Sequence, residues 1–292
     1  MIAEWPGKAG IKQLCRVLEV SRSGYYASRA RAARPAGTGI ADLQVTAVFQ
    51  ASGKTYGSRR VSAALRDQGV DIGRYRARTL MKANGLRPRW RRKFVHTTDS
   101  SHCLATAPNV LNRCFMPLGP NQAWVSDVTY IRTRGGWLYL AAVLDLYSRK
   151  IVGWAMDVQM TAQLVCDALE MAIASRKPSA PLIVHSDQGV QYASTQHRQL
   201  LAMNGFTASM SRRGNCWDNA VMERFFLNLK MERTWHKEYA NHAEARSDVA
   251  DYIVGFYNSV RLHSTLGNRS PNEHEKIHSR TTSALLGVSE IT

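Results

Sequence analysis

The sequence predicts an α/β domain preceded by a basic, all-helical region, and two observations carry this prediction. Apolar runs of strand length, rich in β-branched and aromatic residues, begin at about Trp124, whereas the residues before them follow helical spacing. The charge is also divided unevenly, because residues 1–120 carry a net charge of +15 and residues 121–292 only +2. This division is typical of a nucleic-acid-binding segment joined to an enzyme. On charge alone, a role in solubility or in binding membranes or acidic proteins stays open.

The bulk composition fits a soluble intracellular protein of two compact domains. The chain has 292 residues, 45% of them hydrophobic, which is enough for a sizeable core. We expect its five cysteines to be reduced, because their number is odd and none forms a CxxC pair. No signal peptide is visible, and no apolar run approaches the roughly 18 residues that span a bilayer. A group that could suggest zinc matches no common ligand spacing: His96, His102, Cys103 and Cys114.

Residues 1–39 are predicted to form a basic N-terminal helical segment. Apolar positions from Ile11 to Leu18 lie on one helical face, and a basic run extends from Arg29 to Arg34. The residues alone do not distinguish a part of a DNA-binding region from a solvated basic helix.

Residues 40–93 predict a helix-turn-helix-like DNA-binding region of three short helices. Gly69 and Gly85 are expected to end the second and third helices. A run of five cations around Trp90, from Arg87 to Lys93, would grip a phosphate backbone. The arginines predicted to meet DNA phosphates are Arg59, Arg60, Arg74, Arg91 and Arg92. A small helical bundle with a charged exterior is the alternative.

Residues 94–121 form a proline-containing linker, residues 122–279 the α/β core with its C-terminal helices, and residues 280–292 a tail. Within the core, three strands at about 124–132, 137–145 and 151–156 predict an antiparallel meander. A helical stripe from Leu164 to Ile173 leads to a strand that ends at Asp187. A helix near 196–204, a short strand near 206–210 and a helical segment at 250–257 follow.

Three acids are the candidate catalytic and metal-binding residues. Asp127 lies inside an apolar strand, Asp187 ends a second one, and Glu223 lies on a helix that Asp218 is expected to cap. A buried carboxylate is costly unless it is paired or binds a metal, so the three together suggest a divalent-metal site for phosphoryl transfer. Each acid also has a structural alternative: a strand-end cap, a turn, and a surface ion pair. Asp145 is the competing strand-end acid.

Two further residues share the helical face of Glu223. Asn219 lies one turn before it and Lys230 two turns after it, so both are candidates for orienting the site or contacting DNA. We expect Phe225, Phe226 and Leu229 to face the core.

Several separate motifs resemble those of bacterial insertion-sequence transposases of the OrfB type, whose catalytic core is similar to retroviral integrase. They are Trp124-x-x-Asp127, His185-Ser186-Asp187-x-Gly189, Asn219-Ala220-x-x-Glu223-x-Phe225-Phe226-x-x-Leu229-Lys230, and the closing motif from Tyr257-Asn258 to Ser270-Pro271. Asn112-Arg113-x-Phe115, upstream of the core, is also typical of the family. The 35 residues between Asp187 and Glu223 match the family's spacing.

The resemblance implies a ribonuclease-H-like integrase core, a five-stranded mixed sheet flanked by helices, with Asp127 beside Asp187. It also implies a DDE-type transposase that cleaves DNA and transfers the strand. Asp127 and Asp187 would bind two Mg²⁺ (or Mn²⁺) ions, and Glu223 would complete the second site. Lys230 would contact DNA near the cleavage point.

The resemblance further implies how the chain works with other molecules. The DNA partners would be the element ends and the target, and the upstream OrfA protein would be joined through a frameshift fusion. Pairing two ends requires at least two subunits. The expected location is the bacterial cytoplasm, on the nucleoid, with no membrane. A non-catalytic DNA-binding regulator and a ribonuclease-H-like nuclease are the alternatives.

Overall fold

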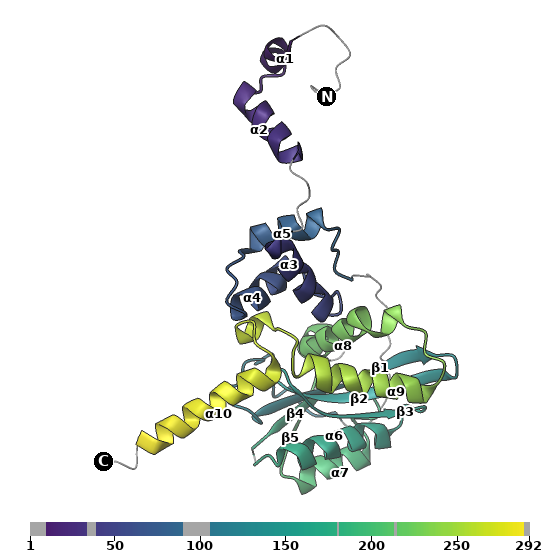
Figure 1. Cartoon of the computed structure of the whole chain (residues 1–292). Coiled ribbons are helices and arrows are strands. Elements are labelled where there is room, and N and C mark those ends of the chain that lie inside the picture. The colour runs from purple at the N-terminus through teal and green to yellow at the C-terminus, as the bar shows by residue number, and fades with distance from the viewer. Residues whose placement is uncertain (1–9, 34–38, 90–105, 180, 213–214, 289–292) are drawn as a thin grey trace. The chain divides into compact units, whose positions relative to one another are not determined.

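The computed structural model describes residues 10–33, 39–89, 106–179, 181–212 and 215–288. Its contacts divide the chain into two units, Met1–Pro88 and Arg89–Thr292. Figure 1 shows helices alone in the first unit and a sheet covered by helices in the second. Arg91 and Arg92 lie outside the described residues, as do His96, His102 and Cys103.

The first unit contains the predicted helices. They are α1 (Ile11–Val17), α2 (Arg22–Ala33), α3 (Ile40–Ala51), α4 (Ser58–Asp67) and α5 (Arg74–Ala83). The last three pack together around buried side chains that include Phe49, Val61 and Leu65. Gly69 and Gly85 follow α4 and α5 with φ of 77° and 65°, a left-handed conformation that favours glycine at a helix end. The prediction of three short helices after residue 40 is confirmed.

The second unit is built on a five-stranded sheet in the order β3-β2-β1-β4-β5. Its strands are β1 (Ala123–Thr133), β2 (Gly136–Asp145), β3 (Ile151–Asp157), β4 (Ile183–Ser186) and β5 (Thr207–Met210). The first three pair antiparallel, which confirms the predicted meander. In contrast, β4 runs parallel to both β1 and β5, so the sheet is mixed.

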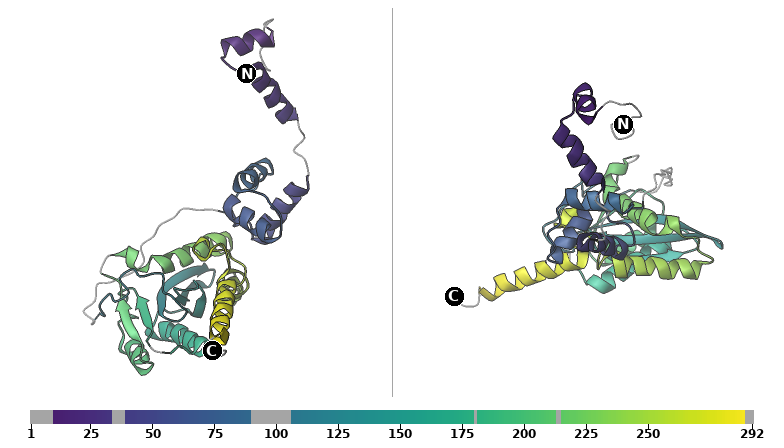
Figure 2. Two further views of the ribbon diagram at one scale, coloured as in Figure 1. Left: turned by 90° about the vertical axis from the view of Figure 1, so that its left-hand side faces the viewer. Right: turned by 45° about the horizontal axis from the view of Figure 1, so that its top comes forward.

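Helices cover both faces of this sheet (Figures 1 and 2). On one face α6 (Ala162–Arg176) and α7 (Thr195–Met203) enclose a core that contains Trp124 and Leu169. On the other face α8 (Ala220–Glu232) and α9 (His242–Asp251) enclose a core that contains Phe225, Phe226 and Leu229, as expected. Such a three-layer arrangement buries the apolar side chains of both sheet faces.

The contact between β3 and α6 depends on one glycine. A Cβ atom at Gly153 would lie 2.2 Å from the carbonyl oxygen of Ala168, so only glycine lets the two backbones approach this closely.

Short helical elements complete the unit. They are η2 (Cys216–Asn219), η3 (Thr234–His236), the π-helix η4 (Tyr252–Tyr257) and η5 (Ser264–Leu266). The last element, α10 (Pro271–Val288), is an α-helix to its end. The sequence predicts a tail from Arg280, but the helix continues there for two further turns. Residues 281–286 contain no glycine or proline, so nothing in the local chain stops it.

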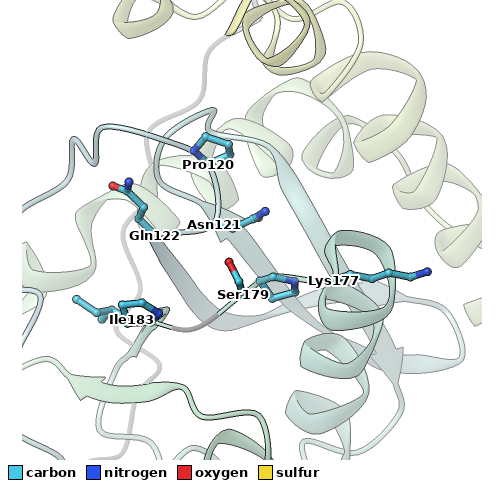
Figure 3. A pocket seen from close by; sticks show the side chains of 8 residues that line it. Pro120, Asn121, Gln122, Lys177, Ser179 and Ile183 are labelled. Atoms are coloured by element: carbon cyan, nitrogen blue, oxygen red, sulfur yellow. The ribbon is translucent and has the colours of Figure 1, made fainter. Parts of the chain in front are cut away.

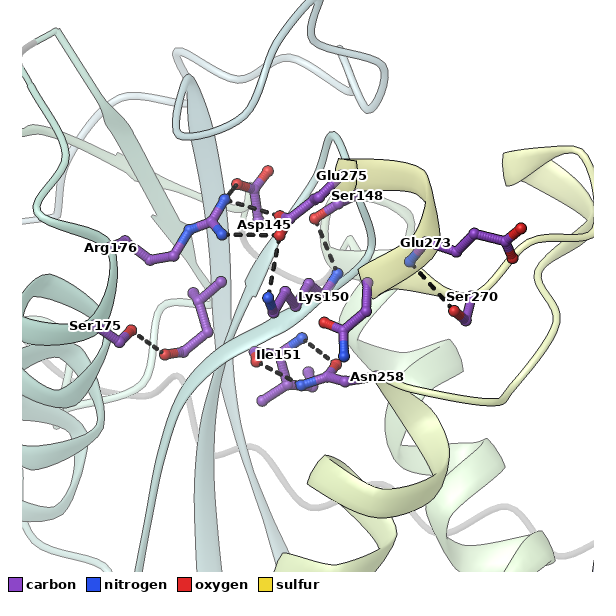
Figure 4. Close-up of polar contacts among 12 residues, drawn as sticks. Asp145, Ser148, Lys150, Ile151, Ser175, Arg176, Asn258, Ser270, Glu273 and Glu275 are labelled. Atoms are coloured by element: carbon purple, nitrogen blue, oxygen red, sulfur yellow. Dashed lines mark hydrogen bonds and ion pairs between the residues drawn. The ribbon is translucent and has the colours of Figure 1, made fainter. Parts of the chain in front are cut away.

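Polar contacts fasten the start of α10 to the sheet (Figure 4). The guanidinium of Arg176 donates to both carboxylate oxygens of Glu275, at 2.9 and 2.8 Å, and to Asp145 Oδ2 at 3.2 Å. Asp145 is fully buried, and its oxygens also accept from the backbone N–H groups of Asn121 and Tyr147. This competing acid is therefore part of the structural framework.

Arg261 is likewise structural. Its guanidinium is 2% exposed and binds both oxygens of Glu232, at 2.8 to 3.1 Å, while the Tyr252 hydroxyl donates to the same carboxylate. Its burial and these contacts give Arg261 a role in the fold. None of the helices in the described ranges is long and apolar enough to cross a membrane.

Candidate active site

The pairing of β1 with β4 brings two of the predicted acids together. Val125 lies directly opposite His185 in this parallel pair. Asp127 and Asp187 each follow two residues later, so they lie at the same level where β4 ends. The C-terminal ends of parallel strands are a common place for ligand sites, because side chains from neighbouring strands converge there.

Backbone N–H groups hold both carboxylates. Asp127 Oδ1 accepts from the N–H of Val128 at 2.8 Å, and Asp187 Oδ1 accepts from the N–H of Gly189 at 3.0 Å. A Cβ atom at Gly189 would lie only 3.0 Å from Asp187 Oδ1. Glycine at this position therefore lets the turn close under the carboxylate.

Glu223 lies in the first turn of α8 and its side chain is exposed. It is near enough to act on Asp127 electrostatically. Burial raises the pKa of Asp127 well above its usual range, and the negative charges of Asp187 and Glu223 raise it further. A buried acid whose ionisation two neighbouring acids disfavour forms part of a site that a cation would stabilise.

A buried network under the acids was not predicted from the sequence. The Tyr192 hydroxyl lies 2.9 Å from Ser126 Oγ, and burial and the charges of Asp127 and Asp187 raise its pKa. His185 lies between two hydroxyls, with Nδ1 2.9 Å from Ser209 Oγ and Nε2 3.2 Å from Ser211 Oγ. Burial lowers the pKa of His185 to about 4, so the imidazole is neutral. These groups hold the strand ends that carry the acids, and no sequence motif marks Tyr192 for this position.

Asn219 and Lys230 both lie beside the acids. Asn219 is buried, and its Nδ2 donates to the carbonyl oxygen of Ser126 at 3.4 Å, which ties the start of α8 to β1. Its Oδ1 is buried and has no hydrogen-bond partner among the described residues. Lys230 Nζ lies 4.6 Å from the centre of the Tyr130 ring. Burial lowers the pKa of Lys230, and the negative charge of Asp127 opposes that shift.

Asp218 does not cap α8, contrary to the sequence prediction. It lies in η2 and is fully buried, because Arg113 and Arg212 both bind its carboxylate, at 2.8 Å and 2.9 Å. Asn109 Nδ2 also donates to it at 2.9 Å. Asp218 thus fastens residues 109–113 to the start of α8 and does not cap that helix. Hydrogen bonds from two charged guanidinium groups are stronger than the single backbone hydrogen bond of a helix cap.

A pocket of about 390 Å³ opens beside the two aspartates. Its lining includes Asp127 and Asp187 together with several aromatic and apolar side chains, described below. Another pocket, of about 590 Å³, lies where β1 and β4 begin, away from the acids, and contains none of the predicted site residues. Figure 3 shows its lining, which includes Pro120, Gln122 and Lys177.

The donor set fits a hard divalent cation, because its atoms are carboxylate oxygens that burial and mutual repulsion destabilise. In the described part of the chain, no three His, Cys, Asp or Glu side chains are gathered closely enough to hold an ion as they lie. Asp127 and Asp187 are the residues best placed to hold it, and Glu223 is exposed at the start of its helix.

The arginines of the first unit that are predicted to contact DNA are exposed or half-buried. Arg59 is exposed on α4, and Arg60 is half-buried with its guanidinium 5.6 Å from the Tyr56 ring centre. Arg74 is exposed at the start of α5, 5.7 Å from the ring centre of Tyr75.

Comparison with family models finds two kinds of domain. An integrase core domain matches residues 117–216, a second integrase core domain model matches residues 204–271, and an HTH-like domain matches residues 40–94. The last match covers α3, α4 and α5, and the first two cover the sheet together with α8 and α9.

Comparison with curated proteins finds close relatives along most of the chain. The transposase InsF for insertion sequence IS3A from Escherichia coli (strain K12) is 41% identical over 269 residues, which are 91% of this chain and 93% of that protein. The insertion element IS600 uncharacterized 31 kDa protein from Shigella sonnei is 44% identical over 268 residues, 91% of this chain and 98% of that one.

Among solved structures, the HTLV-2 integrase catalytic core domain in complex with magnesium matches with a TM-score of 0.42 and 17% identity. That match covers 54% of this chain and 98% of the other.

Proposed function

The chain belongs to the insertion-sequence transposases that include InsF of IS3A, and from that premise we propose which residues perform its chemistry. It is a DNA-binding transposase with an integrase core, a polynucleotidyl transferase that acts in DNA transposition. The catalytic residues in this proposal are Asp127, Asp187 and Glu223. The observation that carries it is the Val125–His185 register, which sets the two aspartates side by side at the end of β4.

Asp127 and Asp187 would hold divalent cations, Mg²⁺ or Mn²⁺, two to a site, and the Glu223 side chain would turn inward to complete the second position. When bound, such ions activate the attacking oxygen and stabilise the leaving one in an in-line displacement. The fit is supported by the raised pKa of Asp127, since a nearby cation removes the repulsion that raises it.

The other residues of the site bind and orient the DNA. Lys230 supplies a positive charge beside Asp127, suited to a phosphate next to the scissile bond. Asn219 offers an unpartnered buried amide oxygen at the start of α8, suited to accept from a water or a nucleotide. The attacking group would be water in strand cleavage and a DNA 3′-hydroxyl in strand transfer, so no covalent intermediate with the protein is required.

Recognition would be divided between the two units. Arg59, Arg60 and Arg74 of the helical unit would contact phosphates, and Arg91 and Arg92, outside the described residues, would do the same. A working complex would contain at least two subunits, because two element ends must be paired. The upstream OrfA protein, joined by frameshifting, would add end recognition, and the reaction would take place on DNA in the bacterial cytoplasm.

The test is cleavage and joining of labelled DNA that carries the element's own ends, in Mg²⁺. We compare the unchanged protein with Glu223→Gln, and supply the OrfA fusion in parallel. We expect joined products that disappear in the variant while DNA binding is retained. If the chain and its OrfA fusion both bind DNA without cleaving it, a non-catalytic regulator is favoured. Activity that survives Glu223→Gln would mean that Glu223 is not the third catalytic acid.

A further inference from the structure

The pocket beside the aspartates has an aromatic wall that metal binding and phosphate transfer do not explain. Its lining includes the β1–β2 hairpin residues Tyr130, Trp137 and Tyr139. Met160 and Val190 form further apolar parts of the lining. Trp137, Met160 and Val190 are 47%, 44% and 43% exposed, and exposed apolar side chains that gather in one place mark an interaction site, unlike single ones.

The register of the hairpin places these rings on one face. Tyr130 lies directly opposite Tyr139, and Trp137 is opposite the next-but-one residue of β1, Arg132. Side chains of one sheet face recur at every second residue, so the three rings are neighbours. Tyr130 and Trp137 are in contact edge to face, with centroids 4.9 Å apart and planes at 85°. Such a contact holds the indole in a defined orientation.

The rings adjoin the end of the polar site. β1 pairs with β4 only from Ala123 to Val125, so β1 continues past the end of β4 toward the rings. The Lys230 ammonium lies 4.6 Å from the centre of the Tyr130 ring and interacts electrostatically with Asp127, so one cation lies near both the acids and the aromatic wall. A ligand in this pocket therefore meets negative oxygens and flat aromatic surface, and the Lys230 ammonium lies beside the pocket, against the Tyr130 ring.

From this arrangement we infer that the pocket is a stacking site for one nucleobase, extruded from the DNA strand next to the phosphate bound at Asp127 and Asp187. The inference rests on the proposed function, which supplies the bound phosphate. A nucleotide is the ligand that combines a phosphate with a flat aromatic group a few ångströms away. An apolar protein side chain would fill the pocket without using the lysine or the adjacent acids.

Stacking on an exposed ring is also sequence-tolerant, because every base has an aromatic face. Extruding a base next to the scissile bond costs stacking and pairing energy, and Trp137 would offset that cost. The ligand is thus one unpaired base on either side of the scissile phosphate, and the pocket does not select which of the four bases it is.

The test is a cycle that changes the ring and the base separately. Full-length protein that carries Glu223→Gln binds element-end DNA without turnover. The dissociation constant of this complex is measured for protein that retains Trp137 and for the Trp137→Leu and Trp137→Phe variants. The DNA is intact or carries an abasic site at the nucleotide on either side of the scissile phosphate. We expect Trp137→Leu to weaken binding of intact DNA about tenfold, and Trp137→Phe less than about threefold. On one of the two abasic DNAs, Trp137→Leu should weaken binding by no more than about twofold.

An equal loss on intact and on both abasic DNAs, or no loss on any, would overturn the stacking site. If Trp137→Leu lowers the melting temperature of the protein, Met160→Ala shortens another part of the lining and should give a smaller loss with the same dependence on the base. Mg²⁺-dependent cleavage by protein that retains Glu223 is measured alongside. Absent cleavage there counts against the proposed function, whereas cleavage with no coupling between ring and base counts against the stacking site alone.

Discussion

Asp127 and Asp187 each lie two residues beyond the directly paired residues Val125 and His185 of neighbouring parallel strands. The two carboxylates therefore lie side by side, and their charges raise the pKa of Asp127 together with its burial. This arrangement is unfavourable for the metal-free protein.

Replacing Asp127 with Asn should stabilise the metal-free protein while abolishing its chemistry. The folded-state pKa of Asp127 is raised, so folding stability falls as pH rises from the unfolded value, about 3.9, through the raised value. Asn carries no charge, so we expect a gain on the order of 1 kcal/mol at pH 7 that vanishes near pH 4. Urea unfolding at both pH values measures it. A variant less stable than the parent at pH 7 would contradict the account.

The same variant separates metal binding from folding. Mg²⁺ should raise the melting temperature of the parent protein, since a ligand that binds only the folded state stabilises it. We expect little or no such rise for Asp127→Asn. An equal rise in both proteins would place the ion elsewhere.

Breaking the Arg261–Glu232 pair should be strongly destabilising. Arg261→Met leaves the buried Glu232 carboxylate without its guanidinium, which typically costs about 3–5 kcal/mol. The matched control is Arg134→Met, because Arg134 pairs with Glu238 at the surface and should matter by about 1 kcal/mol or less. Chemical denaturation compares the two. Similar costs at both sites would contradict the structural role of Arg261.

Asp218→Asn should slow the reaction without weakening DNA binding. The Asp218 carboxylate, held by Arg113 and Arg212, fixes the start of the helix that carries Glu223. Loss of that charge should let Glu223 shift, and a displacement of about 1 Å can cost on the order of 100-fold in rate. Single-turnover cleavage and a binding titration measure the two quantities. The control is Asp167→Asn, an exposed acid on α6 that bonds Gln163, for which we expect no change.

The stability of the fold should decrease in mild acid because of buried neutral histidines. Burial lowers the pKa of His197 to about 4, and its Nδ1 bonds the Tyr192 carbonyl oxygen. The histidine of the unfolded chain binds a proton near pH 6.5. The contribution of His197 to the free energy of unfolding is therefore full above that pH and is lost as pH falls toward 4, by up to roughly 3 kcal/mol for this one residue. His197→Asn should remove about half of the total loss, since His185 shows the same shift. An unchanged pH profile of unfolding would contradict this.

Arg74→Ala should weaken binding to any DNA sequence and reduce the slope of log affinity against log salt by about 1. Arg74 is exposed at the start of α5, where a phosphate contact is predicted. Arg74→Lys keeps the charge and should restore the slope. An unaltered slope in the Ala variant would mean that Arg74 does not contact a phosphate.

The sequence by itself predicted most of the elements and their order, although not α9 or the full length of α10. Apolar runs of strand length marked β1 and β2, helical spacing marked α6, and Gly69 and Gly85 marked helix ends, because each of these signals acts within a few residues of the chain. The same local signals, with the spacing of the motifs, singled out Asp127, Asp187 and Glu223 as the candidate acids, whose catalytic role remains a prediction.

Only the tertiary structure decided which distant residues meet. The sequence left open whether Asp127 adjoins Asp187, and the pairing of β1 with β4 decides it. Two residues bind partners far along the chain: Asp218 was predicted to cap α8, but it binds Arg113, 105 residues away, and Arg261 binds Glu232, 29 residues away. Burial and long-range ion pairs depend on how the layers pack, and no signal within a short stretch of chain encodes that packing.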